Sequence, residues 1–400
     1  MKYAMLSTLI PKEYEEAFRK ESRNNMQDAA NALQWNLYKG FCENLGCHMP
    51  LFNILPVDSF PQYYSRPFVK KFTFNDNGIN IGFCNIKLIR NFFKPIKTYK
   101  VLKAWCRKND GPKTLFVYTL SHHLLKAVNK AKLNYPDLKV CAIVADLPDM
   151  ASLSSKKSAL QKAFTRWSST NAYNLLSCVD SFVLLTKHMA TYMNISQPFV
   201  VMEGIASENN YTPAVSTDEN GERIIMYSGT LHRKFGVLHL LEAFRKIEKE
   251  NYRLVICGIG DSEAEIRQAS KEDSRIIFKG QLSRNEVLEL QKQATVLVNP
   301  RLNNDEFTKY SFPSKTMEYL ASGTPVVAYR LDGIPDEYEP YIFYPADDSI
   351  QTLTELLQQV GEMSENERRQ YGEAAQKYVL EYKNNIVQTK KIIDFLDDIK

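Results

Sequence analysis

The feature that most constrains the fold of this chain is a repeated alternation of short apolar runs with longer helical patterns. Each run has four to six residues rich in β-branched or aromatic side chains, without the polar alternation of a half-exposed strand. Such runs predict strands buried on both faces of a parallel sheet, with helices as the crossover connections. The predicted strands are 115–119, 140–145, 181–186, 199–202, 224–228, 253–257, 275–279, 295–299 and 325–329.

The pattern is interrupted once, in the polar segment 203–222, which has the Asn, Pro, Ser, Thr and Gly content of a linker. With 400 residues, two domains are expected. We predict an α/β chain with two Rossmann-like doubly wound domains facing across a cleft, 1–205 and 222–383. The last helical pattern, about 384–400, has one apolar face that we expect to pack back on the first domain.

Ligands of open parallel sheets bind beyond the carboxyl ends of the strands, so the loops there are the candidate sites. The loop 229–236 contains Gly229, Thr230, Arg233 and Lys234 before a helical pattern, which suits either a phosphate or a tight turn with exposed charges. After the next strand, Gly258 and Gly260 permit close backbone approach, and a plain turn explains them at least as well as a site does.

The segment 311–327 is the strongest candidate. Pro313 and Ser314 favour the start of a helix, and Gly323 favours its end just before the strand 325–329. A helix N-terminus at Ser314 and Lys315 offers amides and a cation to a diphosphate. Glu318, one turn later, could accept two hydrogen bonds from a vicinal diol such as that of ribose, although a surface carboxylate would have the same spacing.

This segment resembles the family 4 glycosyltransferases, in particular bacterial members that build capsular polysaccharides and exopolysaccharides. The resemblance covers about residues 222–380, and the first half only in outline through its strands and the turn 144–148. The blocks that carry it are, in chain order, 227–231, 241–244, 257–260, 278–280, 312–315, 318–319 and 322–327.

The resemblance implies a GT-B enzyme that moves a sugar, as a hexosyltransferase does, from a nucleoside diphosphate sugar to a glycan or a lipid-linked glycan, with retention. It implies no cofactor and no metal, so that protein cations and a helix N-terminus neutralise the leaving diphosphate. Glu318 would hold the ribose, and Lys279 and Gly280 would border the base. The residues expected to contact the donor are Gly229, Thr230, Gly258, Gly260, Lys279, Gly280, Ser311, Ser314, Lys315 and Glu318; those expected to act in catalysis are Arg233, Lys234, Lys315 and Asp146.

The sequence departs from the family pattern at several of these positions. Tyr310 stands where a second glutamate is usual, and Thr230 and Phe235 stand where an arginine and a lysine are usual. These departures keep open a non-catalytic sugar-nucleotide-binding partner subunit of a glycosyltransferase, and a GT-B epimerase is a further alternative. Ala145 replaces a common histidine, so Asp146 is either a polar contact on the acceptor side or a helix-capping aspartate.

Charge is unevenly distributed along the chain, whose net charge is +5. The segment 66–113 contains twelve Lys and Arg residues, two Asp residues and many aromatic residues. This mixture suits an anionic membrane surface or a polyanionic ligand. A core helix with a solvated basic face, carrying Ile96, Tyr99, Leu102 and Trp105 at helical spacing, explains it equally well. No nucleic-acid partner is expected.

Seven scattered cysteines without a CxxC pair indicate reduced thiols, and residues 1–10 lack a signal-peptide pattern. We therefore expect a cytoplasmic protein, with a peripheral position on the inner face of the plasma membrane as an extension of that view. The polar segment 20–37 is a candidate acceptor region, and a polar helix face would account for it equally well.

Overall fold

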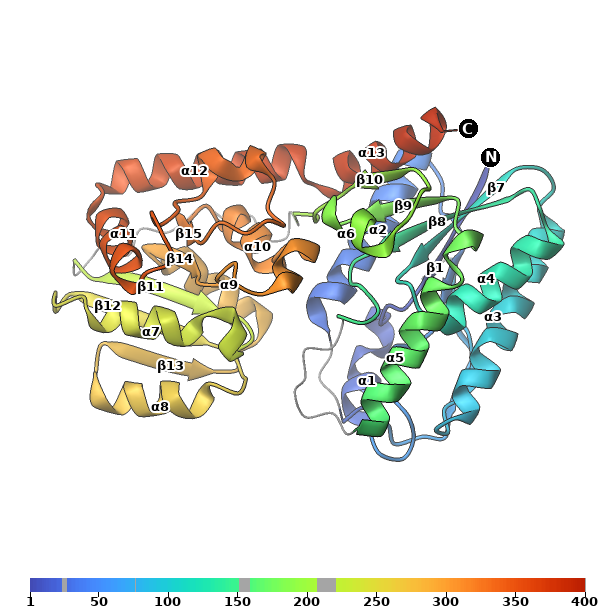
Figure 1. Cartoon of the computed structure of the whole chain (residues 1–400), viewed down its shortest axis with the longest axis horizontal. Coiled ribbons are helices and arrows are strands. Elements are labelled where there is room, and N and C mark those ends of the chain that lie inside the picture. Colours follow the sequence, from blue (N-terminus) through green and yellow to red (C-terminus); the bar gives the residue numbers. More distant parts are fainter. Residues whose placement is uncertain (24–26, 76, 151–158, 207–220, 400) are drawn as a thin grey trace. The chain divides into compact units, whose positions relative to one another are not determined.

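The computed structural model describes residues 1–23, 27–75, 77–150, 159–206 and 221–399. Its contacts divide the chain into two compact units. The first comprises Met1–Glu203 and Asn385–Lys400, and the second comprises Gly204–Asn384. Each unit is an α/β structure built on a parallel sheet (Figure 1).

The first unit contains a sheet with the order β10-β9-β8-β7-β1-β2-β5-β4. All neighbouring strands are parallel except β4, which pairs with β5 antiparallel. A small antiparallel pair joins β3 to β6. The strands are β1 Lys2–Ser7, β2 Leu51–Asn53, β3 Phe68–Val69, β4 Phe72–Phe74, β5 Gly78–Asn80, β6 Phe83–Cys84, β7 Lys113–Tyr118, β8 Leu138–Val144, β9 Ser181–Leu184 and β10 Phe199–Val201.

The helices of the first unit include α13 from the end of the chain. It packs against α2, where Asn44 Nδ2 donates to the carbonyl of Ile386 and to Thr389 Oγ1, at 2.8 Å each. Ile392 and Leu396 are buried. The helices are α1 Glu15–Glu21, α2 Asp28–Leu45, α3 Ile89–Lys108, α4 His122–Asn134, α5 Ala159–Tyr173, α6 His188–Met193 and α13 Asn385–Asp398.

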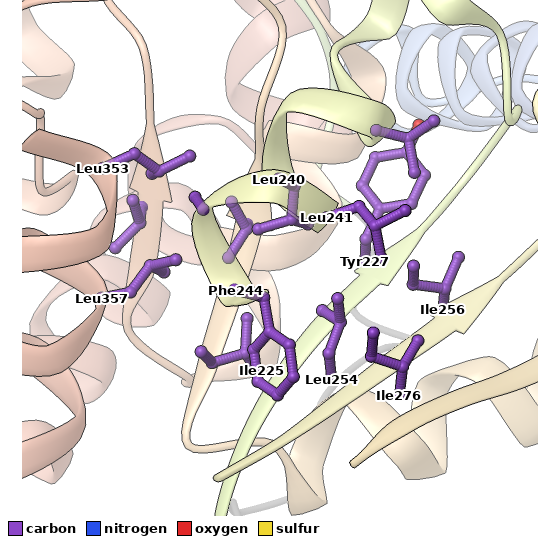
Figure 2. Packing of buried hydrophobic residues seen from close by; sticks show 14 of the residues in the cluster. Ile225, Tyr227, Leu240, Leu241, Phe244, Leu254, Ile256, Ile276, Leu353 and Leu357 are labelled. Atoms are coloured by element: carbon purple, nitrogen blue, oxygen red, sulfur yellow. The ribbon is translucent and has the colours of Figure 1, made fainter. Parts of the chain in front are cut away.

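The second unit contains a five-stranded parallel sheet with the order β13-β12-β11-β14-β15. The inner strands β11, β12 and β14 are largely buried on both faces. On one face, Ile225, Leu254 and Phe244 of α7 belong to a cluster that also includes residues of α11 (Figure 2). The elements are β11 Arg223–Ser228, α7 Val237–Arg245, β12 Tyr252–Cys257, α8 Glu263–Glu272, β13 Ile276–Gly280, α9 Arg284–Gln293, β14 Val296–Asn299, α10 Ser314–Ser322, β15 Val326–Ala328, α11 Ile350–Glu362 and α12 Glu365–Tyr382.

All nine predicted strands are present, shifted by at most two residues at either end. The predicted α/β class with parallel sheets is confirmed. The strands β1 to β6 were not predicted; of these, β1 begins at Lys2 and lies in the middle of the sheet, between β7 and β2. The polar segment 20–37 falls largely on α2, where Asn31, Gln34 and Trp35 bind the backbone of Thr8 and Ile10; Asn24 and Asn25 lie outside the described residues.

Candidate functional site

The strand order of the second sheet places the candidate site. The strand order reverses between β11 and β14. These two strands are neighbours in the sheet, although β12 and β13 come between them in sequence. Ligands of such sheets bind outside the carboxyl ends of the strands at this switch point. The loops that follow β11, β12, β13 and β14 meet there, and α10 begins there because it runs back to the start of β15.

Helix α10 has the bounds that its sequence predicts. It starts at Ser314 after the N-cap Pro313 and ends at Ser322, followed by Gly323 with φ of 80°. Within the described residues, the amides of Ser314 and Lys315 donate to no protein acceptor, whereas that of Thr316 donates to Pro313. Two amides and the positive end of the helix dipole are therefore available to an anion.

The carboxylate of Glu318 is held from two sides. Its Oε1 accepts hydrogen bonds from Lys315 Nζ at 2.6 Å and from Gln291 Nε2 at 2.8 Å, and its side chain is 14% exposed. Burial alone would raise the pKa of Glu318, but Lys315 and Gln291 outweigh it, so the pKa lies below its usual value. Within the described residues Oε2 has no hydrogen-bond partner, so one oxygen of an ionised carboxylate remains available to a ligand hydroxyl.

Further cations lie at this edge of the sheet. Burial raises the pKa of the Cys257 thiol at the end of β12 to about 11, and the charges of Lys279 and Lys315 pull it down. Lys279 and Lys315 thus lie close to the same strand end. Arg284, the first residue of α9, acts on Glu318 in the same way. The structure brings two predicted residues together and adds a third cation that the sequence analysis missed.

The cations of the loop 229–236 are paired with acidic side chains. Arg233 forms a salt bridge with Glu265, and its amide donates to Asp261 Oδ1 at 2.9 Å. Lys234 Nζ lies 3.8 Å from Asp305 Oδ2. Both side chains are about half exposed, so they can reach a phosphate only by exchanging these partners.

The predicted glycines bring the loops of the site close to one another. A Cβ on Gly258 would lie 1.8 Å from the carbonyl oxygen of Gly229, and one on Gly260 would lie 2.3 Å from the backbone of Leu231. The amide of Gly229 donates to Cys257, and that of Gly258 donates to Gly280. Their glycine identity is thus explained by loop packing, and these two amides are already used. Thr230 also serves the loop, since its carbonyl accepts from Tyr227 Oη at 2.8 Å.

Two residues at this edge, Gln291 and Arg301, carry no signal in the sequence pattern. Gln291 binds Ser228 Oγ at 3.0 Å as well as Glu318, and so connects α9, β11 and α10. The guanidinium of Arg301 lies between the rings of Phe235 and Phe307, and burial lowers its pKa to about 10.

Tyr310 and Ser311 are engaged within the loop before α10. Tyr310 Oη donates to Glu306 Oε1 at 3.1 Å, so an acid lies beside the position where the family glutamate is missing. Ser311 Oγ donates to the carbonyl of Phe307 at 3.2 Å.

Asp146 belongs to the first unit, directly after β8. Burial raises the pKa of its carboxyl. The carboxylate acts on the phenol of Tyr118, whose hydroxyl is buried without a hydrogen-bond partner among the described residues. The two groups form a polar pair at the carboxyl edge of the first sheet, in which the phenol of Tyr118 is buried and Asp146 is exposed.

Two further findings concern metals and membranes. In the described part of the chain, no group of three or more His, Cys, Asp and Glu side chains is arranged as a metal site. Among the same residues, no helix combines the length and the apolar composition needed to cross a bilayer.

Comparisons with known structures extend over the whole chain. Sucrose-phosphate synthase from Thermosynechococcus elongatus has a TM-score of 0.65 at 14% identity, with 100% of this chain and 99% of that one covered. The lipopolysaccharide outer core galactosyltransferase WaaB has 0.63 at 15%, with both chains fully covered. HepE of Anabaena, in complex with UDP, has 0.62 at 12%, again with full coverage of both. At these identities the likeness shows the fold, which is the GT-B fold.

A comparison with curated protein sequences gives no match. The family model described as glycosyl transferases group 1 matches residues 212–378, which contain the loops and helix of the candidate site. The second unit of this chain is therefore a glycosyl transferases group 1 domain of the GT-B type.

Proposed function

We propose that the chain transfers a sugar from a nucleoside diphosphate sugar, and that the start of α10 is its donor site. The observation that carries the proposal is the arrangement of Lys315 and Glu318 within the matched domain: two unbonded amides, a cation and a carboxylate with one available oxygen. The two amides and the cation suit a diphosphate, and the carboxylate suits the ribose diol.

The catalytic step follows from the charges at this edge. As the bond to the donor sugar breaks, negative charge develops on the leaving diphosphate, and in this proposal the charges of Lys315, Lys279, Arg284 and the α10 amides stabilise it. The acceptor hydroxyl oxygen bonds to the anomeric carbon on the face that the diphosphate leaves, and a leaving phosphate oxygen takes its proton, which gives retention without a protein base. Protein cations then do this work without a bound metal or cofactor. Arg233 and Lys234 also contact the diphosphate once their salt bridges with Glu265 and Asp305 break.

The acceptor in this proposal is a glycan or a lipid-linked glycan used in bacterial polysaccharide assembly. Asp146 and the Tyr118 hydroxyl support an acceptor position at the carboxyl edge of the first sheet, because neither has a hydrogen-bond partner among the described residues. A hydroxyl of the acceptor can satisfy the buried phenol, which otherwise loses a hydrogen bond on burial.

The Glu318→Gln variant tests the donor site. Its amide cannot accept a charge-assisted hydrogen bond from the ribose, so we expect nucleoside diphosphate affinity to fall by about tenfold or more. UDP, GDP, ADP and dTDP are first compared by thermal shift, because a ligand that binds the folded state raises the melting temperature. The best ligand and its 2′,3′-dideoxy analogue are then titrated into both proteins.

The native protein should prefer the nucleotide with its hydroxyls, and Glu318→Gln should bind the two equally. Glu289→Gln, on the exposed face of α9, is the control and should keep the preference. If Glu318→Gln kept the full preference, the ribose diol would not bind this carboxylate.

A non-catalytic partner subunit remains the second candidate, because Arg233 and Lys234 are tied to acids and Tyr310 replaces a glutamate. The two functions differ in the products that they release. A transferase releases nucleoside diphosphate together with a new glycoside when an acceptor is supplied, whereas a binding subunit releases neither.

We further propose that the first turns of α3 bind an anionic membrane surface. Leu88, Ile89, Phe92, Phe93 and Ile96 are exposed there, beside exposed lysines of the same helix. Of the predicted core positions, Leu102 and Trp105 are buried, so the helix has both a core face and an exposed apolar end.

Phe92→Ser should weaken sedimentation with anionic vesicles by about tenfold. Phe199→Ser, an exposed phenylalanine of β10, should not, and equal loss in both would contradict the assignment.

A further inference from the structure

A second group of cations lies in the first unit, and neither the donor site nor the exposed face of α3 accounts for it. Arg90 and Lys94 lie one turn apart at the start of α3, and His123 is the second residue of α4. These two helices pack side by side (Figure 1). Helix α4 follows β7, and α3 leads back to the start of β7, so both helices begin at the carboxyl edge of the parallel sheet.

Lys94 is the unusual member of the group. Its side chain is 4% exposed, and its Nζ lies 4.4 Å from the ring centroid of Phe83. In the described residues this ammonium has no hydrogen bond and no salt bridge. Burial, followed by the charge of Arg90, lowers its pKa well below the usual value. A buried ammonium is normally paired, because its desolvation is otherwise not compensated.

The groups around Lys94 are also basic. Arg90 Nη2 donates to the carbonyl of Val57 at 2.8 Å, which places the guanidinium beside the segment after β2. The pKa of His123 lies well below its usual value, chiefly because of burial and then because of the positive charges of Lys94, Arg90 and His122. Asp58 is the one carboxylate, among the described residues, that acts on Arg90 and Lys94. Arg90 and Lys94 thus share a single acid, and among the described residues no acid acts on His123.

Backbone amides at the start of α4 add to this excess. The N-cap Ser121 does not cap the helix with its side chain, and its hydroxyl lies 2.8 Å from His123 Nδ1. The amides of Leu124 and Leu125 donate to the carbonyl of Ser121, whereas those of His122 and His123 have no acceptor in the described part of the chain. The helix dipole favours an anion at this point.

We propose that Arg90, Lys94 and His123 bind a phosphate group of the acceptor. That this phosphate belongs to an acceptor rests on the proposed function, whereas phosphate binding itself does not. A phosphate supplies nearly two negative charges and three acceptor oxygens, which match an unpaired ammonium, a guanidinium and an imidazole. The site would select a phosphorylated sugar or a lipid-linked phosphate over a neutral glycan.

The test is a thermal-shift titration of the full chain with inorganic phosphate, against chloride at the same ionic strength. Lys94→Met keeps the buried volume and removes the ammonium, so the phosphate concentration needed for half the shift should rise by about tenfold or more. Lys97→Met removes an exposed lysine of the same helix and should leave the shift unchanged. His123→Gln, at a half-buried position, should also weaken the shift and serves if Lys94→Met folds poorly.

Equal phosphate responses in the native protein, Lys94→Met and His123→Gln would overturn the proposal. Nucleoside diphosphate binding is measured on the same proteins and should be unchanged in Lys94→Met. If the native protein bound no nucleoside diphosphate, the donor-site proposal would be wrong, and the phosphate result would still hold.

Two arms then identify the source of the phosphate. A shift with a soluble hexose phosphate that Lys94→Met weakens indicates a soluble acceptor. Extra sedimentation with phosphatidylcholine vesicles that contain phosphatidic acid, reduced in Lys94→Met but not in Lys97→Met, indicates a lipid-linked one. Either outcome supports the site, and the absence of any Lys94-dependent effect in both arms contradicts it.

Discussion

Replacing Lys315 by methionine is expected to lower sugar transfer by about 10²- to 10³-fold with little loss of stability. The ammonium is one of the charges at the start of α10 that we assign to the leaving diphosphate, and loss of one such preorganised group in other enzymes has an effect of this size. The side chain is 38% exposed, so the fold depends little on it. Initial rates at saturating donor and melting temperatures measure the two effects separately.

The control for this variant is Lys271→Met, which removes an exposed lysine at the end of α8, away from the site loops. Its rate should match that of the native protein. Arg233→Ala should also lower turnover if Arg233 leaves Glu265 for the diphosphate. Native rates in both Lys315→Met and Arg233→Ala would end the assignment of these cations to catalysis.

Gly258→Ala should destabilise the second unit by about 3 kcal/mol or more. Its φ of 139° disfavours any L side chain, and the new Cβ would lie 1.8 Å from the carbonyl oxygen of Gly229, which is backbone and cannot swing away. The loops after β11 and β12 would have to separate. Chemical unfolding of the purified protein measures the change in the free energy of unfolding.

Gly280→Ala is the matched comparison for Gly258→Ala. Gly280 also has positive φ, of 66°, but no atom lies within 4 Å of the position of its Cβ. Only the backbone preference is lost, so we expect about 1 kcal/mol. Similar losses in the two variants would mean that the close approach of the two loops is not what requires a glycine at position 258.

The strands that the sequence predicts best are those buried on both faces. The runs around 224–228, 253–257 and 295–299 appear as β11, β12 and β14 because continuous β-branched runs have few alternatives in a parallel sheet. Strand β1 was missed because it is bounded by the start of the chain and no helical pattern precedes it. The two- and three-residue strands from β2 to β6 are too short to show any period.

The same distinction holds for the candidate site. The start and end of α10 follow from local residues, Pro313, Ser314 and Gly323, and the structure reproduces them. The contacts of Gln291 and Arg284 with Glu318 depend on how α9 lies beside α10, which no local pattern encodes. The salt bridge of Arg233 with Glu265 is likewise a choice between residues far apart in sequence.

The location of a bound nucleotide tests the central claim most directly. A crystal structure of the chain with its preferred nucleoside diphosphate should show the diphosphate at the amides of Ser314 and Lys315 and the ribose hydroxyls at Glu318 Oε2. A nucleotide bound elsewhere, with Lys315 and Gln291 still the only partners of Glu318 among the described residues, would contradict it.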